Sequence, residues 1–474
     1  MSWFGSIGCS TGGALLVSLV SVWLAGRLDE LCQSATGRSR QLLRCLIIMP
    51  FFLPGLVVGY TFRQISLNLV HSPFINTGLY FLLITARSVP VGVLLHGLIP
   101  RPALSPAGRH CLRSAVGRGF VGRWDSRGSN GPLFALIFLL TFQETEIAAL
   151  MQVPVWPEWL FSQRIRGLPF AAAVGDLSLP LTLELPFAIW AARLLRRTTA
   201  SQLREAAPWM TPSSDRWGQI VAWIWCLSAF GFAVLFPLWQ MLRGAIRGGQ
   251  LLAENPQLWE LILHAAVFSG IAALAAFSLT KFLPTFGDRT SQPTVRRLVR
   301  ILIAVVTLTG LIGAFPLGLL LARILEWPPL LGLSNTPLPL LFGMTVWLFP
   351  RGLGLLWLQQ NPSERSAQFL ADQLALRAQP DREAGEIAHL RWHYHGSGVF
   401  WSLALLTNWA WFELMLPSLL APPGLMPAPI MMYNQMHYGH IAGLWAFTTV
   451  TTLVPVAVFS GIYACHRWLI NPRG

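Results

Sequence analysis

This chain has too little charge for a soluble protein. Only 11% of its 474 residues are charged, 54% are hydrophobic, and the mean hydropathy is +0.53. Such a composition cannot cover a globular surface with polar groups. It excludes an ordinary soluble enzyme or binding domain, and we therefore expect an all-α polytopic membrane protein.

Cysteines and catalytic signatures are also scarce. The six cysteines are scattered without any C-x-x-C pair, so the sequence predicts neither a disulfide framework nor a metal site. Nothing resembles a Walker phosphate loop, a Ser/His/Asp arrangement or a dinucleotide signature. We expect no enzymatic activity, no ATP hydrolysis by this chain itself and no cofactor.

Long apolar runs recur along the whole chain, and each is long enough to cross roughly 30 Å of hydrocarbon. Eleven runs are found, at about residues 10–26, 43–62, 78–98, 132–151, 169–195, 218–242, 261–280, 299–322, 337–358, 397–420 and 440–465. The first has no basic segment before it and no small-residue cleavage site after it. We interpret it as a retained helix rather than a signal peptide.

The cations lie in alternate loops. Of 34 lysines and arginines, 26 fall in one set of connections, at 27–44, 101–127, 193–216, 281–300, 365–391 and after Cys465. The positive-inside rule predicts that this set is cytoplasmic, with the N-terminus outside and the C-terminus inside. The net charge of +14 then lies near the membrane surface, where it favours anionic headgroups. We expect membrane lipid, and no nucleic acid, as a partner.

One segment occurs twice, each time at the end of an apolar run. Residues 411–439 match residues 142–170 at a shift of 269 positions, which pairs Glu413 with Glu144. Two shorter pairs follow the same order at nearly the same shift: 51–55 with 314–318, and 89–90 with 349–350. Three ordered matches indicate two homologous halves, an organisation typical of transporters whose pathway lies between repeats.

The two halves are expected to differ in their number of spans. We place the first half at 1–200, with five spans, and the second at 218–474, with six. Residues 201–217 form the polar cytoplasmic linker between them.

Several motifs of the second half carry a family resemblance. They are Glu413, the Leu-Leu-Ala-Pro-Pro-Gly of 419–424, Tyr433-Asn434 and His437-Tyr438-Gly439; Leu53-Pro54-Gly55 and Arg87 followed by Pro90 join them in the first half. In these residues the chain resembles the permease of fused two-domain ABC importers that serve iron(III), thiamine and related solutes. The resemblance covers nearly the whole chain at low identity.

That resemblance implies a type I ABC importer fold in the bacterial inner membrane. It also implies two partners, a cytoplasmic ATPase dimer that drives the cycle and an extracytoplasmic solute-binding protein that delivers the ligand. Permeases of this family dock the ATPase through a short helix with a Glu-Ala-Ala triplet and a following Gly. The loops in the corresponding places are 99–131 and 359–396, and neither has the full pattern.

The second of these loops is the better candidate for docking the ATPase. It has apolar residues at helical spacing, Ala367, Leu370, Ala371 and Leu374, and these predict an amphipathic docking helix. The first loop has several arginines, and its glycines weaken any helix.

Ionisable residues at membrane depth are expensive and need an explanation. For Glu144, Glu146 and Glu413 there are two interpretations. They line a central pathway, where they meet a cationic solute or shape a gate, or they are hydrated and hydrogen-bonded to a neighbouring helix near the outer interface. The resemblance adds Tyr433 and Asn434 to the pathway.

The other buried ions have plainer interpretations. Asp176 and Glu184 lie eight residues apart on one span, and we expect both in structural pairs. Arg87 and Arg351 are expected to snorkel to the cytoplasmic side or to pair with an acid across the bundle.

Other classes remain open. An ion-coupled secondary transporter would show the same paired halves and would work without an ATPase. A membrane-embedded enzyme would need a polar catalytic cluster, which the sequence does not offer. A degenerate permease that serves as a structural subunit would explain the poor docking loops.

Overall fold

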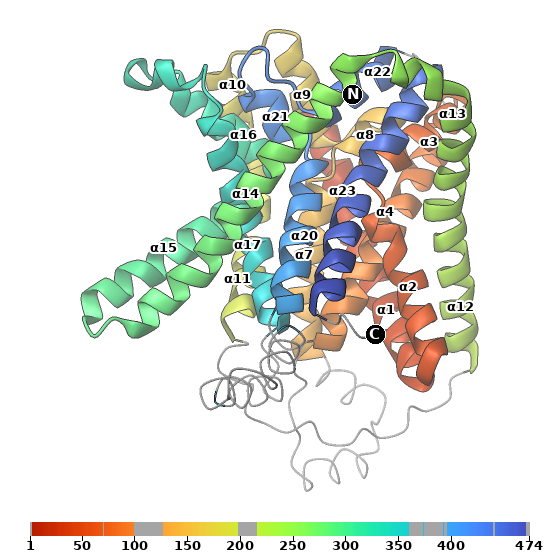
Figure 1. Cartoon of the computed structure of the whole chain (residues 1–474), viewed down its shortest axis with the longest axis horizontal. Coiled ribbons are helices and arrows are strands. Elements are labelled where there is room, and N and C mark those ends of the chain that lie inside the picture. The colour runs from red at the N-terminus through yellow and green to blue at the C-terminus, as the bar shows by residue number, and fades with distance from the viewer. Residues whose placement is uncertain are drawn as a thin grey trace, which may run out of the picture. The chain divides into compact units, whose positions relative to one another are not determined.

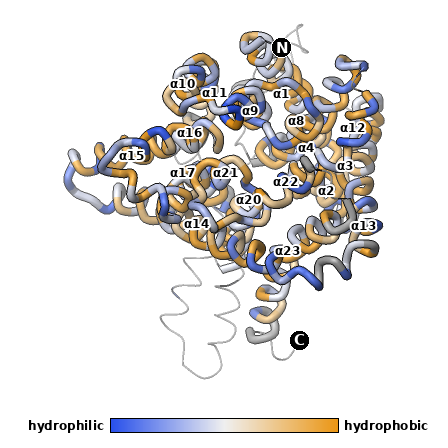
Figure 2. Tube along the Cα trace, turned by 90° about the horizontal axis from the view of Figure 1, so that it is seen from above, coloured by the Kyte–Doolittle hydropathy of each residue, from blue (hydrophilic) through white to orange (hydrophobic). Residues whose placement is uncertain are grey.

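The computed structural model describes residues 2–69, 71–98, 127–197, 216–359, 373, 392, 396–438 and 441–470. Within these ranges every regular element is a helix and no strand occurs (Figure 1). The all-α prediction is therefore confirmed for this part of the chain. Apolar residues are spread along most of the helices (Figure 2), as expected of a polytopic membrane protein.

Packing divides the chain into two compact units, Met1–Arg243 and Gly244–Gly474. The linker expected at 201–217 lies almost entirely outside the described residues. The expected halves are defined by sequence duplication rather than by packing, so they stay a prediction.

Unit 1 is built around its first helix, which packs against α4 and α7. Ser2 caps this helix by accepting a hydrogen bond from the backbone N–H of Gly5 at 3.3 Å. The elements of the unit are α1 (Trp3–Ser34), α2 (Gly37–Phe52), α3 (Gly55–Asn68), α4 (Pro73–Leu98), α7 (Arg127–Phe142), α8 (Glu146–Met151), α9 (Trp156–Ile165), α10 (Phe170–Asp176), α11 (Ser178–Arg197), α12 (Arg216–Phe230) and the π-helical η1 (Gly231–Leu235). Helix α13 (Phe236–Ala253) begins here and ends in unit 2.

Unit 2 is built in the same way around α14 (Pro256–Arg289), which packs against α17 and α20. Proline occupies the first turn of α14 and of α15, where no N–H is needed. The remaining elements are α15 (Pro293–Leu311), α16 (Ala314–Leu325), the 3-10 helix η2 (Pro328–Leu333), α17 (Leu338–Gln359), α20 (Ser397–Trp411), α21 (Met415–Leu420), α22 (Ala428–Tyr438) and α23 (Ile441–Ile470).

The helices of the two units follow one order. A long first helix is followed by a bent pair, a helix with an internal proline and a broken helix. Helix α7 ends at Phe142 and α20 at Trp411, while α8 begins at Glu146 and α21 at Met415. Each of these boundaries is shifted by 269 positions, the shift of the sequence repeat. The duplicated segment therefore folds into the same local structure twice.

The bent pair corrects one of the shorter sequence matches. The bend of unit 1 lies between Phe52 and Gly55, and that of unit 2 lies between Leu311 and Ala314, a shift of 259 positions. The match of 51–55 with 314–318 is therefore displaced by four residues. Its letters agree by coincidence, because proline at position 54 makes one bend and Gly313, at φ 98°, makes the other.

The described residues contain six to nine candidate spans, so the expected number of eleven stays a prediction. Six single helices are long and apolar enough to cross a membrane, within α1, α4, α12–α13, α14, α17 and α23. Three more spans exist if each bent pair is one, with bends of 78° in α2–α3, 50° in α10–α11 and 110° in α15–α16. The expected spans 132–151 and 397–420 are not continuous helices, because each breaks near its C-terminal end.

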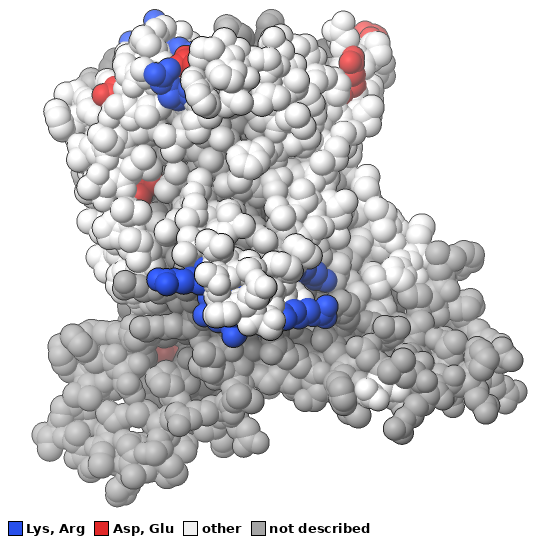
Figure 3. All heavy atoms as spheres, turned by 90° about the vertical axis from the view of Figure 1, so that its left-hand side faces the viewer, with Lys and Arg blue, Asp and Glu red and all other residues white. Residues whose placement is uncertain are grey.

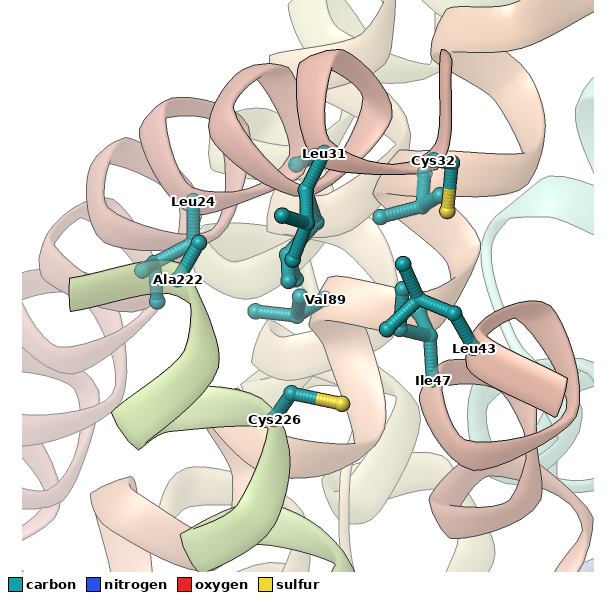
Figure 4. Packing of buried hydrophobic residues seen from close by; sticks show 11 residues of the cluster. Leu24, Leu31, Cys32, Leu43, Ile47, Val89, Ala222 and Cys226 are labelled. Carbon is teal, nitrogen blue, oxygen red and sulfur yellow. The ribbon is translucent and has the colours of Figure 1, made fainter. Parts of the chain in front are cut away.

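A buried cluster joins α12 to the other helices of unit 1 (Figure 4). Leu28 of α1, Ile47 of α2, Val89 of α4 and Cys226 of α12 are all nearly inaccessible. Between helices in a membrane such side chains stabilise the contact by van der Waals packing rather than by transfer out of water. The helix that follows the expected linker thus belongs, by packing, to the unit before it.

Helices α14 and α15 form a hairpin in unit 2 with a basic end (Figures 1 and 3). Arg289, Arg296, Arg297 and Arg300 are exposed there. Further along the hairpin the exposed side chains are apolar, with Phe282 61% and Val305 54% exposed. Large apolar side chains on an outer helix face are typical of a surface covered by lipid tails.

Candidate functional site

In unit 1 the helical structure is interrupted directly after α7, at Gln143, Glu144 and Thr145. We call this interruption the break. The carboxylate of Glu144 accepts hydrogen bonds from the backbone N–H of Ile147 at 2.8 Å and of Ala148 at 3.3 Å. These amides belong to the first turn of α8 and have no partner within that helix. Glu144 therefore caps α8, and the same hydrogen bonds stabilise the non-helical backbone of the break.

The other end of α8 is also held by side chains. The carbonyl oxygen of Met151 accepts hydrogen bonds from Ser66 Oγ at 2.6 Å and from Asn76 Nδ2 at 2.9 Å. Gln152 then leaves the helix in the left-handed region, at φ 56°. Both termini of this six-residue helix are thus satisfied by protein groups, as a backbone inside a bilayer requires.

Helix α3 packs against α8 and completes the site of unit 1. A Cβ added to Gly55, the first residue of α3, would clash with the carboxylate of Glu146 and would lie 2.8 Å from Arg87 Nη1. The carboxylate and the guanidinium therefore meet over the bare Cα of this glycine. Arg87 also interacts electrostatically with Glu144, so one cation faces two acids.

Tyr80 is the last member of this group. Its hydroxyl donates to Glu144 Oε2 at 3.3 Å, and its ring is almost completely buried. Tyr80 and Arg87 lie on α4, seven residues apart, and therefore on one helix face. Helix α4 thus supplies both side chains that act on the capping carboxylate from outside the break.

Unit 2 repeats the break around Glu413. Glu413 Oε1 accepts hydrogen bonds from the backbone N–H of Met415 at 2.9 Å and of Leu416 at 3.4 Å. Helix α16 packs against α21 as α3 packs against α8. The repeat-related glycine contact is apolar in both units: a Cβ on Gly318 would lie 2.8 Å from Leu419 Cδ1, and a Cβ on Gly59 would lie 3.1 Å from Leu150 Cδ1. The cap and this apolar contact are shared by both units, whereas the contact of Gly55 with Glu146 and Arg87 is described in unit 1 alone.

An arginine also acts on the cap of unit 2. Arg351 interacts electrostatically with Glu413, donates to the carbonyl of Trp347 at 2.7 Å and stacks on the Trp347 ring at 3.8 Å from its centroid. It follows Pro350, whereas Arg87 comes three residues before Pro90. The two arginines are thus displaced by one helical turn with respect to the prolines and keep the same face.

Pro350 also explains a close helix contact in unit 2. A proline inside a helix leaves the carbonyl four residues earlier without its N–H partner, here Val346. Gly310 of α15 packs directly against that carbonyl and the Pro350 ring, where no Cβ would fit. The absence of a side chain at Gly310 of the bent pair therefore leaves room for the Pro350 ring and the Val346 carbonyl.

The pathway residues expected from sequence divide into two groups. The structure brings Glu146 and Glu144 together with Arg87, and places Glu413 in the matching break. Tyr433 and Asn434 lie on α22, which packs mainly against α14 and α23.

The structure does not test the expected docking residues. Ala367, Leu370, Ala371 and Leu374 lie outside the described residues, so their role stays a prediction.

Several residues of the site had no signal in the sequence. Tyr80, Ser66 and Asn76 are single polar residues on apolar helices, and only their contacts distinguish them. For Arg87 and Arg351 the pairing alternative is correct in part, since each interacts with an acid of its own unit.

The expected structural pairing fails for Glu184. The bend of 50° after Asp176 separates that residue from Glu184. Glu184 is fully buried, and neither of its carboxyl oxygens has a hydrogen-bond partner within the described part of the chain.

The geometry limits the chemistry of the site. No group of three or more His, Cys, Asp or Glu side chains that could hold a metal ion occurs among the described residues. What each unit offers is a short helix inside a broken span, capped by a carboxylate next to an arginine. Searches against family models, curated proteins and solved structures found no match to this chain.

Proposed function

We propose that this chain is the permease subunit of an ABC importer. It forms the solute pathway and is coupled to a separate cytoplasmic ATPase dimer and to an extracytoplasmic solute-binding protein. The observation that carries the proposal is the duplicated break, in which two helices stop at repeat-related positions and are each capped by a glutamate. Discontinuous helices with irregular backbone at membrane depth are a recurrent way to build transport sites.

The breaks suit a pathway for a physical reason. Irregular backbone is tolerated in the hydrocarbon region only where protein buries it or where it lines a cavity. Glu144 and Glu146 are partly accessible and Glu413 is nearly buried, so the carboxylates of unit 1 are better placed to meet a solute. In this proposal Arg87 and Arg351 keep the charge of the breaks balanced when no solute is present.

The proposal is tested by reconstitution. The genes beside that of this chain are searched for an ATPase and a solute-binding protein. The chain is placed in liposomes with them, and uptake of ferric citrate and of thiamine is measured with and without ATP. We expect uptake of one solute that requires ATP. Glu144→Gln and Glu413→Gln should each reduce it, whereas Glu260→Gln, at a side chain that is 67% exposed, should not.

Two results would overturn the proposal. One is the absence of an ATPase that binds the chain. The other is uptake that continues without ATP and stops when an ionophore removes the ion gradient.

The second of these results would favour an ion-coupled secondary transporter. One observation supports that alternative, namely the fully buried Glu184 carboxyl group without a partner, because buried carboxyl groups form the proton relays of many transporters.

A further inference from the structure

A carboxyl group of unit 1 lies beside the break and takes no part in the cap. Glu184 lies on α11, which packs against α7 and α10, and the residue is 0% exposed. Neither carboxyl oxygen has a hydrogen-bond partner among the described residues. The one side chain in that part of the molecule that acts on this carboxyl is the Gln143 amide, in the break itself.

Among the described groups only the uncharged Gln143 side chain would stabilise an ionised carboxylate at this place. A charged side chain at the centre of a membrane costs about 2.5–3.5 kcal/mol on insertion scales, and more where no partner or water defect relieves it. No cation acts on Glu184 among the described side chains. The described charged groups nearest in the chain on the elements around α11 are Glu144 at the end of α7 and Asp176 at the end of α10, and neither is a cation that could balance a carboxylate.

A proton is the ligand that this environment accepts. A metal ion needs several oxygen or nitrogen ligands, and no suitable cluster occurs in the described ranges. A larger cation would need access, but Glu184 has none. A bound proton removes the charge and needs no further ligands. It leaves an O–H group that can donate a hydrogen bond to the Gln143 amide oxygen.

We propose that Glu184 is a proton-binding site of unit 1, held as a neutral carboxylic acid inside the membrane next to the capped break. The repeat-related position of unit 2 has no carboxyl group. The matching position is Leu453 on α23, which like Glu184 comes two residues before an internal proline and is 53% exposed. The proposal does not depend on the ABC importer function, because it concerns the state of one side chain.

A neutral buried acid has a characteristic reactivity toward apolar carbodiimides. The carboxyl oxygen bonds to the central carbon of the reagent while the acid proton moves to one of its nitrogens. Where water is excluded, the acyl group then shifts to the other nitrogen and gives a stable N-acylurea. Exposed acids are ionised at neutral pH and lack the proton that the first step needs.

Infrared spectroscopy tests the protonation state directly. The full-length chain in lipid nanodiscs at neutral pH should show a carboxylic acid C=O stretching band that is lost in Glu184→Gln and in Glu184→Leu. Glu413→Gln and Glu260→Gln are the matched controls and should leave the Glu184 contribution in place. A wild-type spectrum that keeps the same acid band after Glu184→Gln, or has no such band, would overturn the proposal.

Carbodiimide labelling is the second measurement. An apolar carbodiimide should modify Glu184 at neutral pH, as mapped by peptide mass spectrometry, and should leave the exposed Glu260 unmodified. Labelling of Glu260 to the same extent would contradict a protonated state that is specific to the buried site. Loss of the infrared band on Glu184→Gln without labelling would keep the protonated state and show that the reagent cannot reach it.

Discussion

Both units contain a capped helix break, but the residues around the break differ. Each interrupts a helix at the same repeat position and caps the next short helix with a glutamate. Both units place an arginine and an apolar glycine contact beside the cap, and unit 1 adds Tyr80, Glu146 and the buried Glu184. The shared part is therefore the backbone break and its cap, and the part that differs is the charge.

This difference separates the features that any helix break requires from those that are specific to unit 1. A break must be capped wherever it occurs, because unsatisfied amides are too costly in a membrane. Extra acids are not needed for that purpose and carry a cost of their own. We infer that unit 1 holds the groups that act on ions or protons, while unit 2 mainly preserves the architecture.

The largest effect is expected from removal of the two arginines. Loss of one partner of a buried pair costs about 3–5 kcal/mol. Because Arg87 faces Glu144 and Glu146 while Arg351 faces Glu413, Arg87→Met should destabilise the chain more than Arg351→Met does. Unfolding of each variant in mixed micelles, followed by circular dichroism, gives the two costs.

Compensating changes sharpen this test. Glu146→Gln should recover part of the stability lost in Arg87→Met, and Glu413→Gln should do so for Arg351→Met. Double-mutant cycles without coupling at either pair would show that the arginines act through other contacts.

A smaller effect is expected from the glycines at the helix contacts. Gly55→Ala would force a methyl group between the Glu146 carboxylate and Arg87, and overpacking of this kind costs about 1–3 kcal/mol. Gly318→Ala meets the end of the flexible Leu419 side chain and should cost less. The same unfolding measurement compares them, and equal costs would contradict the polar contact over Gly55.

The smallest effect is expected from Tyr80→Leu. This change gives unit 1 the residue that unit 2 has at the matching place, the fully buried Leu340. It removes one hydrogen bond to Glu144, which contributes about 0.5–1.5 kcal/mol or somewhat more to a charged acceptor. A loss well above that range would mean that Tyr80 has a further role, and an unchanged stability would mean that its hydrogen bond to Glu144 contributes nothing.

The sequence predicted the class and the repeat but not the contacts. Composition and apolar runs predicted the helical membrane architecture, and the two breaks lie at the shift of 269 positions that relates the duplicated segments. The runs around 132–151 and 397–420 predicted continuous spans, because hydropathy does not reveal where a side chain takes over the hydrogen bonds of the backbone. The pairing of 51–55 with 314–318 failed for a related reason, since proline and glycine bend a chain equally well.

The surroundings of Glu184 could not be predicted from the sequence for another reason. Asp176 and Glu184 have helical spacing on paper, and only the bend after Asp176 separates them. Gln143, which acts on Glu184, lies far away along the chain, and a single sequence gives no sign of which distant residues meet.

The charge alternation of the loops predicts that the ends of both broken spans, 132–151 and 397–420, face the outside. Gln152→Cys and Ala421→Cys, at the matching ends of α8 and α21, are introduced singly into a chain whose native cysteines have been replaced. Labelling with a membrane-impermeant maleimide is then compared in right-side-out and inside-out vesicles. The account predicts that both positions react from the outside, whereas labelling from opposite sides would contradict it.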